Sequence, residues 1–243
     1  MLIDLHVRTP FEEGDPDVET LLRACAKAGL DGLCLVGDGE APSLEEARQC
    51  PEAESLALFF GLEVQVEDGY LIWIPENPAV FESDDWMEDG EPPRTMDGIS
   101  SLAESRGGVI IAVHPYDRSR EPLFRDAVYD LGRVDAIEIA NANLARTPNN
   151  LAIEAAVKMK RSSVGGTGPM RGPGSIGRSA TVFLDDVKEQ ADLVAAVARG
   201  DVWAVDFLDR LDGPRGRGGS QGRGRNRRSR SGGNDRGPRE RRD

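Results

Sequence analysis

The segment Leu2-Ile3-Asp4-Leu5-His6-Val7-Arg8-Thr9 decides the fold class of this 243-residue chain. Its apolar residues predict a strand over residues 2–7. A helix is predicted over 17–28, where Val18, Leu21, Leu22 and Cys25 recur at helical spacing before Gly29 ends the run. A strand followed by an amphipathic helix is typical of an α/β fold.

The same alternation continues to residue 205. We expect further strands over 32–36, 57–66, 70–74, 108–113, 136–139, 163–165, 181–184 and 202–205, with a hairpin turn at Glu67-Asp68-Gly69. We expect further helices over 44–49, 99–106, 149–160 and 191–198. The alternation indicates an α/β fold with a largely parallel sheet, either a barrel or a doubly wound sheet. In a barrel, functional residues lie at the carboxyl ends of strands.

Composition indicates one barrel-sized globular domain. The chain is 39% hydrophobic, which is enough for one sizeable core. It has no apolar run near the roughly 18 residues of a membrane span, and its start lacks the charge pattern of a signal peptide. Three cysteines are too few for a disulfide framework. These features predict a reduced, cytoplasmic protein with no membrane partner.

The charge distribution divides the chain into a domain over residues 1–211 and a tail over 212–243. Residues 213–243 contain eleven arginines and three acids, a net charge of +8, while the remainder carries −21 within a total of −13. The tail has no apolar side chains to offset the entropy of ordering, so we expect disorder. Flexible Arg-Gly segments pair with phosphates and stack on bases. We therefore expect the tail to bind RNA or another single-stranded nucleic acid, or to dock on its own acidic barrel. The expected contacts are Arg215, Arg217, Arg223, Arg225, Arg227, Arg228 and Arg230.

Four further segments accompany the opening one. They are Gly61-Leu62-Glu63-Val64, Ala112-Val113-His114-Pro115-Tyr116, Val164-Gly165-Gly166-Thr167-Gly168-Pro169-Met170 and Ile176-Gly177-Arg178-Ser179-Ala180-Thr181. In order and spacing these segments resemble the PHP family, the polymerase and histidinol-phosphatase type of metal-dependent phosphoesterase. The resemblance covers nearly all of residues 1–207. It implies a distorted seven-stranded barrel that binds two or three metal ions through His, Asp and Glu.

The resemblance also implies that the metal site is degenerate. Three family ligands remain, and they are His6, Glu63 and His114. Asp38 is retained, but Gly39 follows it where the family has His. Arg8, Gly168 and Met170 stand at other ligand positions, and Tyr70 replaces a histidine of one family branch. Glycine cannot ligate a metal, and arginine offers only donors and a permanent positive charge. We expect Arg8 to act as a counter-charge to Asp38 or Glu63.

Two classes of function follow from these features. The first is a non-catalytic PHP-like domain, a pseudoenzyme that requires no cofactor and whose tail binds RNA. The alternative is a metal-dependent phosphoesterase, a nuclease or nucleotidase, with a reduced site that holds one weakly bound Mn, Zn or Fe ion, since three protein ligands and water suffice for a catalytic zinc site. A third possibility is that the domain binds an anion through Arg8.

Overall fold

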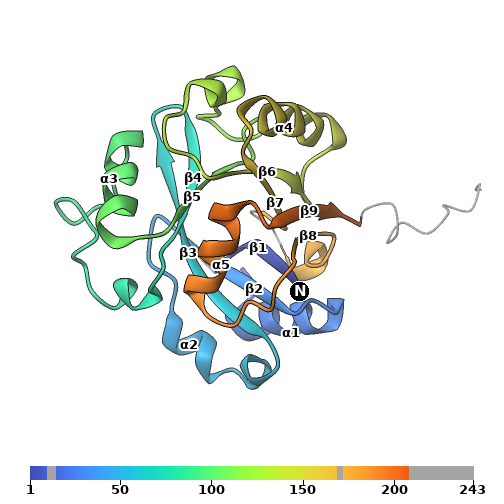
Figure 1. Ribbon diagram of the computed structural model, residues 1–243. Helices are drawn as coiled ribbons and strands as arrows, with labels where there is room; N and C mark the ends of the chain where they lie inside the picture. Colours follow the sequence, from blue (N-terminus) through green and yellow to red (C-terminus); the bar gives the residue numbers. More distant parts are fainter. Residues whose placement is uncertain (10–14, 169–171, 208–243) are drawn as a thin grey trace, which may run out of the picture. The chain divides into compact units, whose positions relative to one another are not determined.

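Nine strands form one sheet in a computed structural model that describes residues 1–9, 15–168 and 172–207. The sheet order is β7-β6-β5-β4-β3-β2-β1-β8-β9, and the sheet curls into a nearly closed barrel (Figure 1). The strands are β1 (Leu2–Arg8), β2 (Gly32–Asp38), β3 (Ala57–Val66), β4 (Gly69–Ile74), β5 (Val109–Val113), β6 (Ala136–Asn141), β7 (Ser162–Gly166), β8 (Ser179–Phe183) and β9 (Val202–Asp206).

The strand number corrects the seven strands that the family resemblance implied. All nine segments that the apolar pattern predicted are strands in the structure. The sheet is also less parallel than expected, because β1–β2, β2–β3, β5–β6 and β6–β7 are parallel while the other four pairings are antiparallel. The tight Glu67-Asp68 turn forces β4 to run back along β3, and β9 returns along β8.

The helices pack around this sheet. They are α1 (Val18–Ala28), α2 (Leu44–Gln49), α3 (Met96–Arg106), α4 (Arg146–Met159) and α5 (Gln190–Arg199), with short 3-10 helices η1 (Pro51–Glu54), η2 (Pro78–Glu82), η3 (Arg125–Asp130) and η4 (Pro173–Ser175). Helices α3 and α4 begin three residues before the predicted positions because their first three residues, Met96-Asp97-Gly98 and Arg146-Thr147-Pro148, carry no apolar repeat. No helix in the described ranges has the length and apolar character of a membrane-spanning segment.

Helix α5 covers the end of the barrel where the parallel strands begin. Its Leu193 and Val197 belong to the same buried cluster as Ile3, Phe59 and other side chains of the barrel interior. At its first residue, the Gln190 amide hydrogen-bonds both the backbone N–H and the C=O of Phe60. This end is therefore filled, and the opposite end, where the parallel strands finish, is left for polar side chains.

Strand β7 closes the barrel through side chains and close backbone contact. The Thr181 hydroxyl of β8 accepts from the Gly165 N–H and donates to the Gly165 C=O, each at 2.9 Å. A Cβ at Gly165 would lie 2.7 Å from the Ala180 carbonyl oxygen, and one at Gly166 would lie 2.6 Å from the His6 nitrogen. The two glycines allow β7 to approach β1 and β8 at distances that no side chain would permit.

The buried Asp4 side chain joins the segment after β7 to β1. Its carboxylate accepts from the Thr167 N–H at 2.8 Å, from the Thr167 hydroxyl, and from the His6 N–H at 3.1 Å. The Gly168 N–H in turn donates to the His6 carbonyl at 2.8 Å. These bonds hold His6 in place at the open end of the barrel.

Candidate metal-type site

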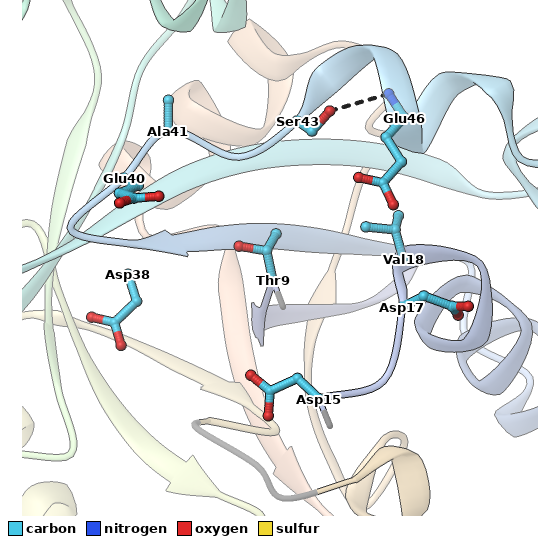
Figure 2. A pocket seen from close by; sticks show the side chains of 9 residues that line it. All are labelled: Thr9, Asp15, Asp17, Val18, Asp38, Glu40, Ala41, Ser43 and Glu46. Atoms are coloured by element: carbon cyan, nitrogen blue, oxygen red, sulfur yellow. Dashed lines mark hydrogen bonds between the residues drawn. The ribbon is translucent and has the colours of Figure 1, made fainter. Parts of the chain in front are cut away.

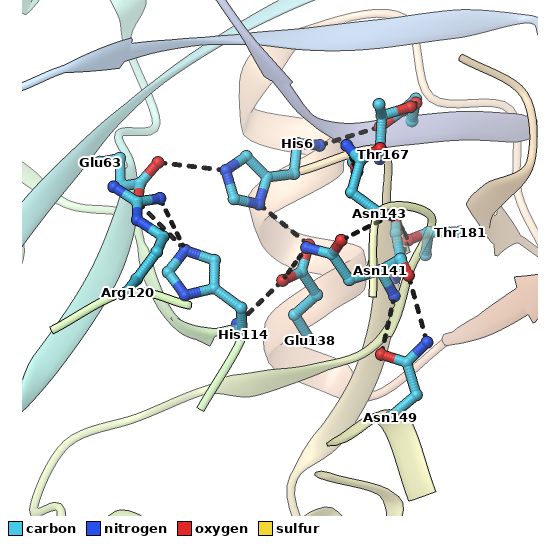
Figure 3. Close-up of polar contacts among 12 residues, drawn as sticks. His6, Glu63, His114, Arg120, Glu138, Asn141, Asn143, Asn149, Thr167 and Thr181 are labelled. Atoms are coloured by element: carbon cyan, nitrogen blue, oxygen red, sulfur yellow. Dashed lines mark hydrogen bonds and ion pairs between the residues drawn. The ribbon is translucent and has the colours of Figure 1, made fainter. Parts of the chain in front are cut away.

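The open end of the barrel brings together polar residues from four strands (Figure 3). His6 lies near the end of β1, and His114 directly follows β5. Glu63 and Glu138 lie within β3 and β6, three residues before the end of each strand. Because Glu63 pairs with Asp38, the last residue of β2, it is nevertheless level with the end of its neighbouring strand.

Glu63 is the centre of the site. Its side chain is fully buried, and its two oxygens are bonded to different partners. Oε2 lies 3.2 Å from His6 Nε2, and Oε1 lies 3.1 Å from His114 Nε2. The imidazole rings are stacked with centroids 5.8 Å apart. Ligand atoms of these three residues all lie within 4.8 Å of one another, which is close enough for one metal ion to touch all three.

Glu138 orients the His6 imidazole and holds the backbone of His114. Its Oε1 lies 2.9 Å from His6 Nδ1, and its Oε2 accepts from the His114 backbone N–H at 2.9 Å and from the Asn141 amide at 3.0 Å. Carboxylates that fix the second nitrogen of an imidazole are typical of metal-binding histidines. His114 adopts a φ of +34°, which is uncommon for a side-chain-bearing residue and is held here by these contacts.

The charges of the site favour a protonated His6. Burial would lower the pKa of this imidazole, but Glu138 and Glu63 outweigh it and raise the pKa to about 10. Burial likewise opposes ionisation of Glu63, yet hydrogen bonds from His114 and His6 hold the pKa of Glu63 well below its usual range. An imidazolium has no free lone pair for a metal. A metal ion must therefore displace a proton from His6 before binding it.

Arg120 places a second cationic group against Glu63. Its Nη1 lies 2.9 Å from Glu63 Oε1 and 3.2 Å from His114 Nε2, and its guanidinium stacks on the Tyr70 ring with Cζ 4.1 Å from the centroid. Sequence analysis missed this residue. It lies in the polar loop between β5 and η3, where no apolar periodicity marks any position.

Arg8 forms an ion pair with Asp38, as expected from the sequence. Its Nη1 lies 3.0 Å from Asp38 Oδ2, and its Nη2 lies 3.4 Å from Asp15 Oδ2. Burial raises the pKa of Asp38, with a further increase from Glu63, and Arg8 opposes both. Two carboxylates therefore hold the Arg8 guanidinium, which disfavours a role for Arg8 as an anion-binding group.

The same carboxylates open onto an acidic cavity of about 300 Å³ (Figure 2). Asp15, Asp17, Asp38, Glu40 and Glu46 all line it. Its charge repels phosphates and other anions. This side of the barrel mouth is consequently unsuited to a polyanionic substrate.

Gly168 and Gly39, where the family resemblance led us to expect ligands, differ in the room available for a side chain. At Gly168, φ is +77° and a Cβ would lie 2.2 Å from the Asn141 amide nitrogen, so a ligating side chain cannot be accommodated in this backbone conformation. At Gly39, φ is +71° but no atom lies within 4 Å of a Cβ. Met170 and the tail arginines from Arg215 to Arg230 lie outside the described residues.

Comparisons with known proteins show the fold and leave the family open. No family model matches the chain, and no curated protein does. Among solved structures, PsfC from Pseudomonas syringae PB-5123 is 15% identical with a TM-score of 0.63, over 86% of this chain and 92% of that one. A candidate metal-dependent phosphoesterase from Bifidobacterium adolescentis is 16% identical with a TM-score of 0.54, over 86% and 98%. An amidohydrolase from Chromobacterium violaceum, with bound sulfate and no metal, is 13% identical with a TM-score of 0.58, over 86% and 99%. The chain thus has the barrel fold of metal-dependent hydrolases.

The donor set fits one metal ion and does not fit two. Two imidazoles and one carboxylate match the three protein ligands of a catalytic zinc site, which keeps its fourth position for water. A second ion would need further carboxylates or imidazoles. Among the described residues, the Glu138 carboxylate is already bonded to His6 Nδ1 and to the His114 backbone, and Asp38 is already paired with Arg8.

Proposed function

We propose that this chain is a non-catalytic protein of PHP type that acts by binding, with an Arg-Gly tail that engages RNA. The observation that carries the proposal is the ion pair between Arg8 and Asp38, with 3.0 Å between Nη1 and Oδ2. The Arg8 guanidinium is a permanent cation, and on Asp38 it takes the place of the second ion of a two-metal site. A site without that ion cannot stabilise both the attacking and the leaving oxygen of a phosphoester.

Metal content and turnover test the barrel half of this proposal. Full-length protein, purified with Mn²⁺, Zn²⁺ and Fe²⁺ retained in the buffers, should contain less than one metal ion per chain. It should hydrolyse nucleotides and short RNA no faster than background. Two or more tightly bound ions per chain, with turnover that Glu63→Ala or His114→Ala abolishes, would contradict the proposal.

The tail half of the proposal rests on composition and charge. Binding should tolerate any single-stranded sequence and weaken steeply with salt, because each phosphate contact releases counterions. If about five phosphates are engaged, the log–log salt slope should be about −3.5. Deleting residues 213–243 should remove nearly all affinity, since the remaining domain carries −21 and repels RNA.

Two controls sharpen the tail experiment. Replacing all eleven tail arginines by lysine keeps the charge and should weaken binding, because lysine lacks the guanidinium plane that stacks on bases. The tail as a separate peptide should bind RNA more tightly than the full chain if it otherwise docks on its own acidic domain. A chain that ends at residue 212 and binds RNA as well as the full chain would place the RNA site in the barrel.

One observation favours a second candidate function, a one-metal phosphoesterase. The His6–Glu63–His114 triad could hold a single Zn, Mn or Fe ion, and a solved structure with the same fold is a candidate metal-dependent phosphoesterase. A stoichiometric single metal with phosphodiester or phosphomonoester turnover would support this alternative.

A further inference from the structure

Arg120 and a metal ion would compete for the same atoms. Arg120 Nη1 lies 2.9 Å from Glu63 Oε1 and 3.2 Å from His114 Nε2. Both are ligand atoms of the triad, and both must face a metal ion for the ion to bind. A metal bonded to these atoms would lie where the guanidinium nitrogen lies, so the two occupants exclude each other.

Charge reinforces this exclusion. Glu63 is fully buried, and its carboxylate already faces His6 and Arg120. A divalent ion entering beside the guanidinium would meet a permanent like charge in a poorly hydrated site, where repulsion is poorly screened. The ion therefore binds only after Arg120 leaves.

The Arg120 side chain has an adjoining cavity into which it can move. A cavity of about 290 Å³ adjoins it, lined by Asp38, Gly39, Gln65, Tyr70, Pro92 and Arg94. The Arg120 side chain is 21% exposed and comes from a loop, so it can reach water without moving a strand. Asp38 offers a second carboxylate within that cavity, and the Tyr70 ring offers a surface along which the guanidinium can slide.

We infer that Arg120 is a displaceable internal cation that closes the His6–Glu63–His114 triad to metal, and that its removal turns the triad into a site for one zinc-class ion. The inference rests on the proposed function in one respect, which is that the purified wild-type protein contains less than one metal ion per chain. Glu138 already orients the His6 imidazole and holds the His114 backbone in a geometry suited to such an ion. The device is regulatory, because any ligand that draws Arg120 into the cavity would raise metal affinity by the same factor as metal raises the affinity for that ligand.

Cobalt and zinc titration of the full-length protein tests the inference. Arg120→Gln removes the cation and should bind one equivalent of Co²⁺ about tenfold or more tightly than the wild type. The visible absorption of Co²⁺ should show four-coordinate geometry with nitrogen ligands. Arg120→Lys keeps a cation at the site and should stay near the wild-type affinity.

Arg94→Gln is the matched control, because Arg94 lines the same cavity and pairs with Glu91, away from the triad. It should leave cobalt affinity unchanged. Adding Glu63→Gln to Arg120→Gln should abolish binding and so locate the metal. Circular dichroism and thermal melting check that each variant is folded, and Arg120→Met serves as a second neutral variant if Arg120→Gln is not.

Equal cobalt affinities for the wild type and both neutral variants, whether weak or tight, would overturn the inference. Tight binding of Co²⁺ by Arg120→Lys would overturn the explanation that a cationic side chain at this position excludes the metal ion. Neither result depends on hydrolysis. Stoichiometric metal and turnover in the wild type would instead overturn the proposed function, so the two failures are distinguishable.

Discussion

Neutralising Glu63 should destabilise the metal-free protein. In a metal site that lacks its ion, no cation balances the charge of the converging ligands. Removing a carboxylate there increases the stability of the fold or leaves it unchanged. Here Glu63 is fully buried and accepts hydrogen bonds from His6, His114 and Arg120 at 3.2, 3.1 and 2.9 Å. Its charge therefore already stabilises the folded barrel without metal.

The size of the effect follows from these contacts. Removing one partner of a buried ion pair costs about 3–5 kcal/mol, because the other charge is left without compensation. Glutamine keeps the volume and one acceptor oxygen, but its NH₂ group faces a donor, so we expect about 3 kcal/mol for Glu63→Gln. In a domain of this size that loss lowers Tm by about 6–12 °C.

Thermal and urea unfolding in EDTA measure this change. Glu154→Gln, on the exposed face of α4, makes the same chemical change and should alter the free energy of unfolding by less than about 0.5 kcal/mol. A Tm for Glu63→Gln equal to or above that of the wild type would refute the reasoning, because it would show that Glu63 is an unpaired metal ligand.

Three further changes should have measurable effects. Folding raises the pKa of His6 to about 10. The stability that its protonated form contributes is therefore complete below about pH 6.5 and is lost as the pH rises towards 10. The urea midpoint of the wild type should fall between pH 7 and 10, and that of His6→Gln should fall less. Gly165→Ala should cost about 1–3 kcal/mol by overpacking β7 against β8, whereas Gly132→Ala, with nothing within 4 Å of its Cβ, should unfold at nearly the wild-type urea concentration. Arg8→Met should lower stability by about 1–3 kcal/mol at pH 7 by leaving Asp38 without its partner, and the loss should shrink in calorimetry at pH 4; an equal loss at both pH values would count against the ion pair.

Local pattern was sufficient to predict the elements of the barrel. The strands stand out as short apolar runs, the five α-helices have apolar residues at helical spacing over most of their length, and capping groups such as Asp17 and Gly29 mark where α1 begins and ends. The candidate ligands His6, Glu63 and His114 came from the order and spacing of the segments that resemble the PHP family. The count of seven strands was wrong because it came from the family resemblance, while the apolar pattern itself contained nine segments.

Only the tertiary structure decided what the site contains. Arg120 is 57 residues from Glu63 in sequence, and its polar loop carries no periodic signal, so its position depends on the packing of β4 and β5 and on the Tyr70 ring. The absence of room for a side chain at Gly168, which follows β7, depends on Asn141 at the end of β6. Local spacing in the sequence determines which side chains are available to the site. The distances between them and their pKa values arise from long-range packing. Those distances decide whether the His6–Glu63–His114 triad faces a metal ion or a guanidinium.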